Sequence, residues 1–137
     1  MNDTLLQAIR NEEVSYHTES VRDIFIYKLH NFEHLDEWFE TQKSTFIKSV
    51  IVGVSHTFSV IHHNDIQLVV EGQNKVKALQ DFINGKFSLD PLVTLPELSG
   101  MFYKDLPNKL KIILLQNNNL SIKSYKSSAA KFFSYAF

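Results

Sequence analysis

The chain has 137 residues, of which 44% are hydrophobic, and it contains no cysteine. This length suits a single domain with its own core, and the lack of cysteine excludes a disulfide framework, a thiol nucleophile and a thiolate metal site. The 14 basic and 15 acidic residues give a net charge of -1, which argues against nucleic-acid binding through a broadly basic face.

The N-terminal sequence MNDTLLQAIRNEE is acidic and differs from a signal peptide, which has a basic start and an apolar centre. Asn2 or Asp3 can cap a short helix that carries Leu5, Leu6 and Ile9 on one face. No apolar run approaches the ~20 residues that span a bilayer. We therefore predict a cytoplasmic protein that does not enter the membrane.

A strand and then a helix are predicted next. Residues 24–29, IFIYKL, are β-branched and aromatic, which favours a strand. From Asn31 the apolar residues recur at helical spacing, so we expect an amphipathic helix of about three turns. Its apolar positions are Leu35, Trp38, Phe39 and Phe46.

The middle of the chain predicts a β-hairpin followed by a second helix. Val and Ile dominate residues 57–62 and 66–71, and Asn64-Asp65 between them is a turn signal, so these two strands are expected to be antiparallel. The helix begins with Asn74 as its cap and ends at Gly85, which suits a left-handed cap.

The C-terminal part is harder to assign. LVTL at 92–95 and LKIILL at 110–115 are interpreted as strands, and 120–137 as one or two helices. The tail is aromatic to its last residue, which is unusual for a chain end. We hypothesise that it covers an apolar surface used in self-association or partner binding. Its aromatic residues are Phe132, Phe133, Tyr135 and Phe137.

The predicted order of elements is β-α-β-β-α-β-β with helices at both ends. This order predicts an α+β fold, a ferredoxin-like mixed sheet with helices on one face plus terminal helices. Without repeats or a linker, residues 1–137 are expected to form a single domain.

The stretch HHNDIQLVVEG at 62–72 resembles the hairpin of BLUF domains, the flavin-based blue-light sensors, whose third strand ends in Leu-Glu-Gly before a helix. Tyr27 stands where that family has a functional Tyr, and Thr57 where its second strand starts with Thr-Gly. The resemblance covers about residues 22–115. It leaves 1–21 as an N-terminal helical extension and 116–137 as a C-terminal helical tail.

The departures from that family concern its flavin site. The Gln that BLUF photochemistry needs falls on Leu68, and the adjacent Gln67 points to the opposite face of the strand. The flavin-holding Asn falls near Val50 and Ile51. An enclosed isoalloxazine ring needs polar partners, so the resemblance implies a scaffold that has lost flavin and light sensing. If FAD or another flavin is bound, the candidate cofactor-binding residues are Tyr27 and Gln67.

No catalytic or metal-binding residues are predicted. His62 and His63 are consecutive, so on a strand they point to opposite faces and do not share a metal. Ser55 and His56 diverge for the same reason, and Glu71 is expected to cap a helix rather than act as an acid or base. We therefore do not expect an enzyme.

The leading hypothesis is a non-catalytic regulatory or protein-interaction module on a BLUF-like scaffold, without bound flavin. It predicts a protein partner of unspecified identity, and the C-terminal aromatic tail offers a route to a homo-oligomer. The first alternative is a flavin-binding blue-light photoreceptor in which Tyr27 and Gln67 take the photoactive roles. The second is a small inhibitor or immunity protein that blocks a partner protein.

Overall fold

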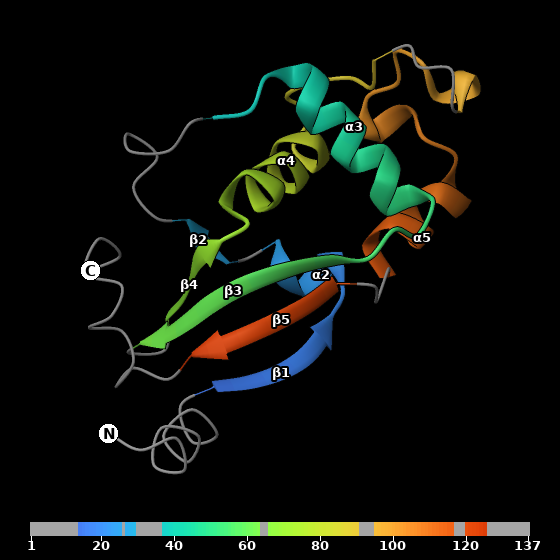
Figure 1. Ribbon diagram of the computed structural model, residues 1–137. Helices are drawn as coiled ribbons and strands as arrows, with labels where there is room; N and C mark the ends of the chain where they lie inside the picture. Colours follow the sequence, from blue (N-terminus) through green and yellow to red (C-terminus); the bar gives the residue numbers. More distant parts are fainter. Residues whose placement is uncertain are drawn as a thin grey trace, which may run out of the picture.

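The computed structural model describes residues 14–25, 27–29, 37–63, 66–90, 95–116 and 120–125. These residues form an α+β fold in which the helices lie over one face of a mixed sheet (Figure 1). Within these ranges no helix has both the length and the apolar character needed to cross a bilayer.

In the described ranges the sheet has five strands, in the order β1-β5-β3-β4-β2. They are β1 (Val14–Glu19), β2 (Lys28–Leu29), β3 (His56–His63), β4 (Ile66–Glu71) and β5 (Leu120–Tyr125). Neighbours β1/β5 and β3/β4 are antiparallel, whereas β3/β5 and β2/β4 are parallel. The predicted mixed sheet is thus confirmed. Its ferredoxin-like order is not confirmed, because β1 and β5 come from segments that the sequence analysis interpreted as helical.

The hairpin of β3 and β4 agrees with the predicted strands at 57–62 and 66–71. The register shifts between Ser59 and Val60, which oppose Glu71 and Val69, so Val70 of β4 is an extra residue in the ladder. Because strand side chains alternate, Val60 faces the helices and Ile61 faces the other side of the sheet.

Helix α4 (Gln73–Ile83) also agrees with the prediction, and Gly85 has the expected left-handed backbone, with φ 77°. Its N-terminal cap is Gly72, with φ 90°, and not Asn74 as predicted. The Asn74 side chain instead accepts a hydrogen bond from the backbone N–H of Trp38 at 3.0 Å. A contact between distant segments therefore replaces the local cap.

Helix α3 (Glu40–Ile51) starts later than predicted. Trp38 and Phe39 precede it, and residues 31–36 of the predicted helix lie outside the described residues. The side chain of Gln42 accepts from the backbone N–H of Phe39 at 2.8 Å, which satisfies one of the donors that a helix start leaves open. This local bond fixes the start of the helix beyond the aromatic pair.

Only a remnant of the predicted strand at 24–29 is observed, the two-residue β2. Helix α2 (Val21–Ile24) takes its first part, and Ser20 and Asp23 form a reciprocal capping box at the helix start. Val21 and Ile24 are fully buried. The spacing of Ser20 and Asp23 is a capping-box signal in the sequence, but the apolar run at 24–29 favoured a strand.

The predicted strand at 110–115 is a helix, α5 (Asn108–Gln116). The Pro107 carbonyl accepts from the backbone N–H groups of Leu110 and Lys111 and so starts the helix. Leu114 is buried, whereas Ile112 and Ile113 are exposed. Burial of only one side of the segment is typical of a surface helix, although the continuous apolar run favoured a strand.

Two predicted helical extensions contain strands. Residues 14–19 and 120–125 pair along their length as β1 and β5, and β5 alternates buried and more exposed positions with a period of two. The aromatic tail, 126–137, and most of the predicted strand at 92–95 lie outside the described residues. Leu95, the last residue of that predicted strand, has a left-handed backbone, with φ 59°, and is not part of a strand. Short 3-10 helices occupy Pro96–Leu98 (η2) and Tyr103–Asp105 (η3).

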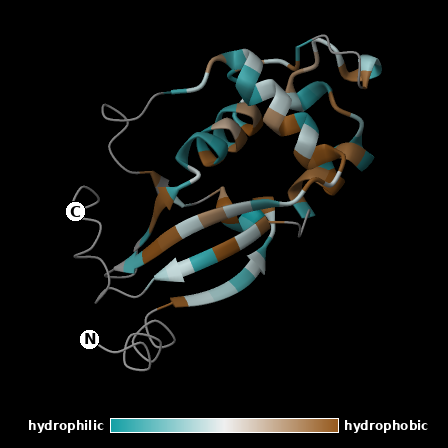
Figure 2. Cartoon of the chain, in the orientation of Figure 1, coloured by the Kyte–Doolittle hydropathy of each residue, from teal (hydrophilic) through white to brown (hydrophobic). Residues whose placement is uncertain are grey.

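The core has two parts, one on each face of the sheet. The larger lies between the sheet and the helices, and the smaller consists of Ile61, Leu68 and Val70 on the other face. Figure 2 shows that β3 and β4 are largely hydrophobic whereas β1 is paler and more hydrophilic. The largest fully buried side chains of the helix side are Phe58, Phe82, Ile24, Ile47, Leu79, Leu89, Leu114, Leu120 and Ile122.

A buried ion-pair cluster joins α3 to α4. Asp81 is only 5% exposed and accepts from Lys43 at 3.0 Å and from Lys77 at 3.1 Å. Burial alone would raise the pKa of Asp81, but the hydrogen bonds from these two lysines hold it below its ordinary value. The ion pair of Lys43 with Asp81 joins α3 to α4, the two helices that border the candidate site.

Candidate binding groove

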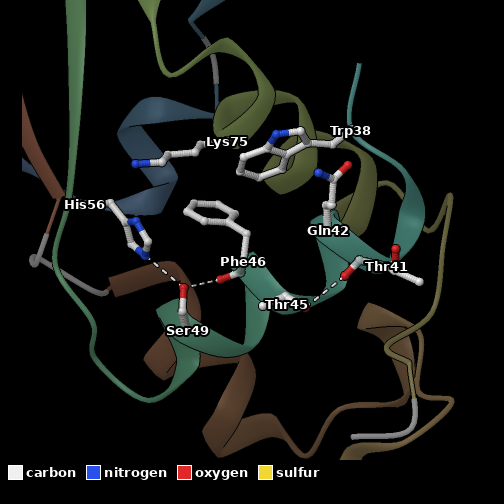
Figure 3. A pocket seen from close by; sticks show the side chains of 8 residues that line it. All are labelled: Trp38, Thr41, Gln42, Thr45, Phe46, Ser49, His56 and Lys75. Atoms are coloured by element: carbon white, nitrogen blue, oxygen red, sulfur yellow. Dashed lines mark hydrogen bonds between the residues drawn. The ribbon is translucent and has the colours of Figure 1, made fainter. Parts of the chain in front are cut away.

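A surface hollow of about 530 Å³ lies where α3, the start of β3 and the start of α4 meet. Figure 3 shows the Phe46 ring between His56 and Trp38. Lys75 lies on the side of this ring opposite Thr45 and Ser49. We call this hollow the groove. Its lining residues are Trp38, Thr41, Gln42, Thr45, Phe46, Ser49, His56 and Lys75.

One face of α3 supplies the polar wall of the groove. Thr41, Thr45 and Ser49 are spaced by four residues, so they lie one above another on the helix. The Thr45 hydroxyl donates to the Thr41 carbonyl at 3.0 Å. These residues therefore present short hydroxyl side chains rather than charges along this wall.

Three aromatic rings form the apolar part of the groove. The Phe46 ring meets Trp38 at a centroid distance of 5.9 Å and an angle of 61°, and it meets His56 at 4.6 Å and 71°. Such edge-to-face contacts are favourable and hold the rings in fixed orientations. Phe46 is buried beneath the other two, which leaves part of Trp38 open to a ligand.

Ser49 and His56 are hydrogen-bonded across the turn between α3 and β3, with 2.8 Å between Oγ and Nε2. The Ser49 hydroxyl also lies 2.6 Å from the Phe46 carbonyl and donates to it. With that proton engaged, His56 donates from Nε2 to the Ser49 oxygen. The pair therefore acts as a structural tie, because a nucleophilic serine would have to donate to the histidine.

His56 is neutral at physiological pH. Burial lowers its pKa, and the positive charge of Lys75 lowers it further. Of the eight lining residues, Lys75 is therefore the one that carries a charge. Its amine also lies 5.8 Å from the centroid of the Phe58 ring. The groove combines aromatic surface, hydroxyl groups and one cation, which suits a ligand with an apolar body and a carboxylate.

A smaller hollow of about 210 Å³ adjoins the groove and shares Trp38 and Lys75 with it. Gln73 lines this hollow and is 7% exposed, and its Oε1 atom has no hydrogen-bond partner among the described residues. An unsatisfied buried acceptor is costly for the protein. The remaining lining residues are Val70, Gly72 and Asn74.

The two flavin candidates from the sequence lie elsewhere. Tyr27 is buried in the core on the helix side, and its hydroxyl donates to the carboxylate of Glu19. Burial, the hydrogen bond and the charge of Glu19 all raise the pKa of Tyr27. Gln67 is half-buried and lies two residues before Val69, so it shares the helix side with Tyr27, whereas Leu68 faces away.

His62 and Glu71, two of the polar residues weighed in the sequence, lie at different places on the hairpin of β3 and β4. His62 lies in β3 with Nε2 3.2 Å from the Ser124 hydroxyl, and Glu71 is exposed at the end of β4. Across the described ranges, no three His, Cys, Asp or Glu side chains are grouped so that they could hold a metal ion. The side chain of His63 lies outside the described residues.

Sequence reasoning missed the groove because its residues come from three separate segments. The sequence places Ser55 next to His56, but the serine that bonds to His56 is Ser49, seven residues away. The available signal was the spacing of Thr41, Thr45 and Ser49, which marks a polar face on α3.

No model of a known protein family matches this chain, and neither curated proteins nor solved structures show significant similarity to it.

Proposed function

We propose that the protein is a non-catalytic interaction module that binds a segment of a partner protein in the groove. The observation that supports this most is the partly exposed ring of Trp38, packed on the buried Phe46, beside the cation Lys75. An aromatic or apolar side chain of the partner would lie against Trp38, and a neighbouring carboxylate would pair with Lys75. The ligand class is thus an acidic segment with an aromatic anchor.

The groove favours a peptide segment over an enclosed small molecule. It is a broad surface hollow on the outside of α3, and the smaller hollow continues it past Lys75. Cofactor sites usually enclose most of their ligand, whereas peptides bind in open grooves with pockets for single side chains. Hydroxyl groups on the rim provide hydrogen bonds without the desolvation cost of further charges.

Catalysis is not part of this proposal. The Ser49 hydroxyl donates within its own helix, and in the described part of the chain no carboxylate bonds the other ring nitrogen of His56. The pair therefore has neither the proton arrangement nor the orienting acid of a hydrolytic triad.

The BLUF-like scaffold remains part of the proposal, in its flavin-free form. Flavin binding is the second candidate because Tyr27 and Gln67 share the helix side of the sheet. Against it, the Tyr27 hydroxyl is engaged by Glu19. An absorbance spectrum of protein purified with FAD and riboflavin separates the two. We expect a colourless protein, and flavin bands that shift to the red after blue light would establish the photoreceptor instead.

Peptide selection tests the interaction function. A random peptide library displayed on phage is selected against the full-length protein, and binding is followed by the fluorescence of Trp38, the one tryptophan in the sequence. We expect the selected peptides to combine an aromatic residue with an acidic one and to change the Trp38 emission.

Lys75→Gln provides the charge control. Removing this cation should weaken binding of the acidic peptides about tenfold, the size of one charge-assisted contact. Lys109→Gln, on the exposed surface of α5, should leave the affinity unchanged. Peptides that lack acidic residues, or that bind both variants equally, would contradict the proposal.

A further inference from the structure

We propose that His56 holds the carboxylate of the bound segment together with Lys75, and that His56 becomes protonated as the segment binds. This inference rests on the proposed function and names a second residue that contacts the charged group of the ligand. His56 is the first residue of β3, Lys75 lies in the first turn of α4, and both line the groove. Figure 3 shows the Lys75 amine on the His56 side of the Phe46 ring, with Trp38 on the other side. The charged end of the groove is thus separate from its aromatic end.

The two bases at this end have no acidic partner in the part of the chain that the structure describes. None of the ion pairs there involves Lys75 or His56. By contrast, Lys43 and Lys77 of the same two helices both pair with Asp81. Two neighbouring bases without an acid attract an anion from outside the chain, because its charge stabilises both of their protonated forms.

The groups that face His56 come from three elements. Helix α3 contributes the Ser49 hydroxyl, 2.8 Å from Nε2, and the Phe46 ring, with 4.6 Å between the ring centroids. Strand β5 places Leu120 opposite it in the sheet, and α4 contributes Lys75. Among these described neighbours Lys75 is the one that carries a charge, so the free protein keeps the His56 ring neutral.

A carboxylate bound beside Lys75 reverses the charge that acts on His56. It offsets the field of the Lys75 ammonium and attracts the imidazolium form, and both effects raise the pKa of the ring. The proton comes from the solvent and goes to Nδ1, because Nε2 already donates to Ser49. Since the pKa is higher in the complex than in the free protein, the affinity for the segment rises as the pH falls from the bound value towards the free one.

Calorimetry in different buffers tests the inference. A selected acidic-aromatic peptide without histidine is titrated into the full-length protein at pH ~6.5 in two buffers whose ionisation enthalpies differ, which measures the protons taken up on binding. We expect a net uptake, and an affinity about tenfold higher at pH ~5.5 than at pH ~8, the size of one charge-assisted contact. The same peptide with its carboxylate replaced by a carboxamide should bind without proton uptake.

His56→Gln assigns the proton to His56. Glutamine is neutral at every pH and its amide can still donate to Ser49, so the peptide should bind this variant without proton uptake and with the same affinity at both pH values. At pH ~8 the variant should bind about as tightly as the wild type, whose His56 is then neutral. His17→Gln, on the exposed part of β1, is the matched control and should keep the uptake and the pH dependence.

The outcomes separate this inference from the proposed function. Peptides that depend on Lys75 but bind without proton uptake, or with the same uptake in His56→Gln, would overturn the role of His56 alone. Peptides that ignore Lys75 would overturn the groove as the binding site, and the role of His56 with it.

Discussion

His56 illustrates how one side chain in the groove depends on its neighbours. It packs on Phe46, bonds to Ser49 and lies within the field of Lys75. Burial and the nearby cation both favour the neutral ring, since each penalises the imidazolium form. The groove therefore keeps one positive charge, that of Lys75, over the physiological pH range.

An NMR titration of the histidine ring protons tests this arrangement. We expect the pKa of His56 to lie below its ordinary value of 6.5. In Lys75→Gln it should rise towards that value, because the cation is gone while the burial remains. Since the folded pKa is lowered, the unfolded chain binds the proton more readily, and stability should fall as the pH drops through and below 6.5. A His56 pKa above 6.5, or one unchanged by the variant, would contradict the geometry.

Asp81 is the acceptor of the buried ion-pair cluster, so its loss should cost the protein stability. Asp81→Asn leaves the buried Lys43 without its closest carboxylate, so we expect the free energy of unfolding to fall by about 3 kcal/mol. Urea unfolding measures it, with Glu97→Gln as an exposed control.

The pH dependence provides a second check on Asp81. Its folded pKa is lowered, so the stabilisation is present above the unfolded value and is lost as the pH falls through the folded pKa. The difference between wild type and Asp81→Asn should therefore shrink in acid. A constant difference from neutral pH to pH ~3 would mean that the ion pair contributes little.

At the scale of single residues, the sequence could indicate types of side chain but not their partners. Trp38 and Phe46 were assigned to the same helix, yet Trp38 lies before α3 and reaches Asn74. The pairing of Ser49 with His56 depends on the turn between α3 and β3, which no local pattern specifies. Such contacts form only in the folded chain, so the sequence alone could not predict them.

At the scale of elements, the turn from β4 into α4 depends on Gly72. Its φ of 90° lies in the left-handed region, and a Cβ there would come within 2.7 Å of Phe58. Gly72→Ala should therefore lower the free energy of unfolding by about 2 kcal/mol or more, from strain and overpacking together.

Gly85→Ala is the matched control for Gly72. Its φ is 77°, but nothing lies within 4 Å of the added Cβ, so only the backbone strain of about 1 kcal/mol is expected. Thermal and urea unfolding compare the two variants. Equal losses would show that the close approach of Phe58 is unimportant.

Elements were predictable where local signals agreed. The hairpin and α4 had β-branched strands, a turn dipeptide and a terminal glycine, and both strands and the helix are observed. The run at 110–115 had no periodicity that separates a buried strand from a helix, and the structure resolves it as α5. The polar strand β1 was missed because it forms a strand by pairing with β5, more than 100 residues away, and not through a local pattern.

At the scale of the whole molecule, the sheet is buried on both sides of its β3–β4 half. Ile61, Leu68 and Val70 are at most 9% exposed on the face away from the helices, whereas Tyr16 of β1 is 74% exposed. Tyr125 at the end of β5 packs against this smaller cluster. The aromatic tail, 126–137, follows Tyr125 in the sequence and lies outside the described residues.

We expect that tail to contribute to stability. In the full-length chain, Phe132→Ser combined with Phe133→Ser should lower the free energy of unfolding by about 2 kcal/mol or more, since each buried Phe is worth about that much. Lys131→Ser is the neighbouring control. If the double variant unfolds like the wild type and keeps its oligomeric state, the tail covers no apolar surface.

The most direct test of the groove is a map of the backbone and side-chain amide signals during titration with a selected acidic-aromatic peptide. We predict that the largest shifts occur at the Trp38 indole and at the side-chain amides of Gln42 and Gln73, with smaller ones along α3. Shifts confined to α5 around Ile112 and Ile113, or to Tyr16 on β1, would place the binding surface elsewhere and contradict the proposal.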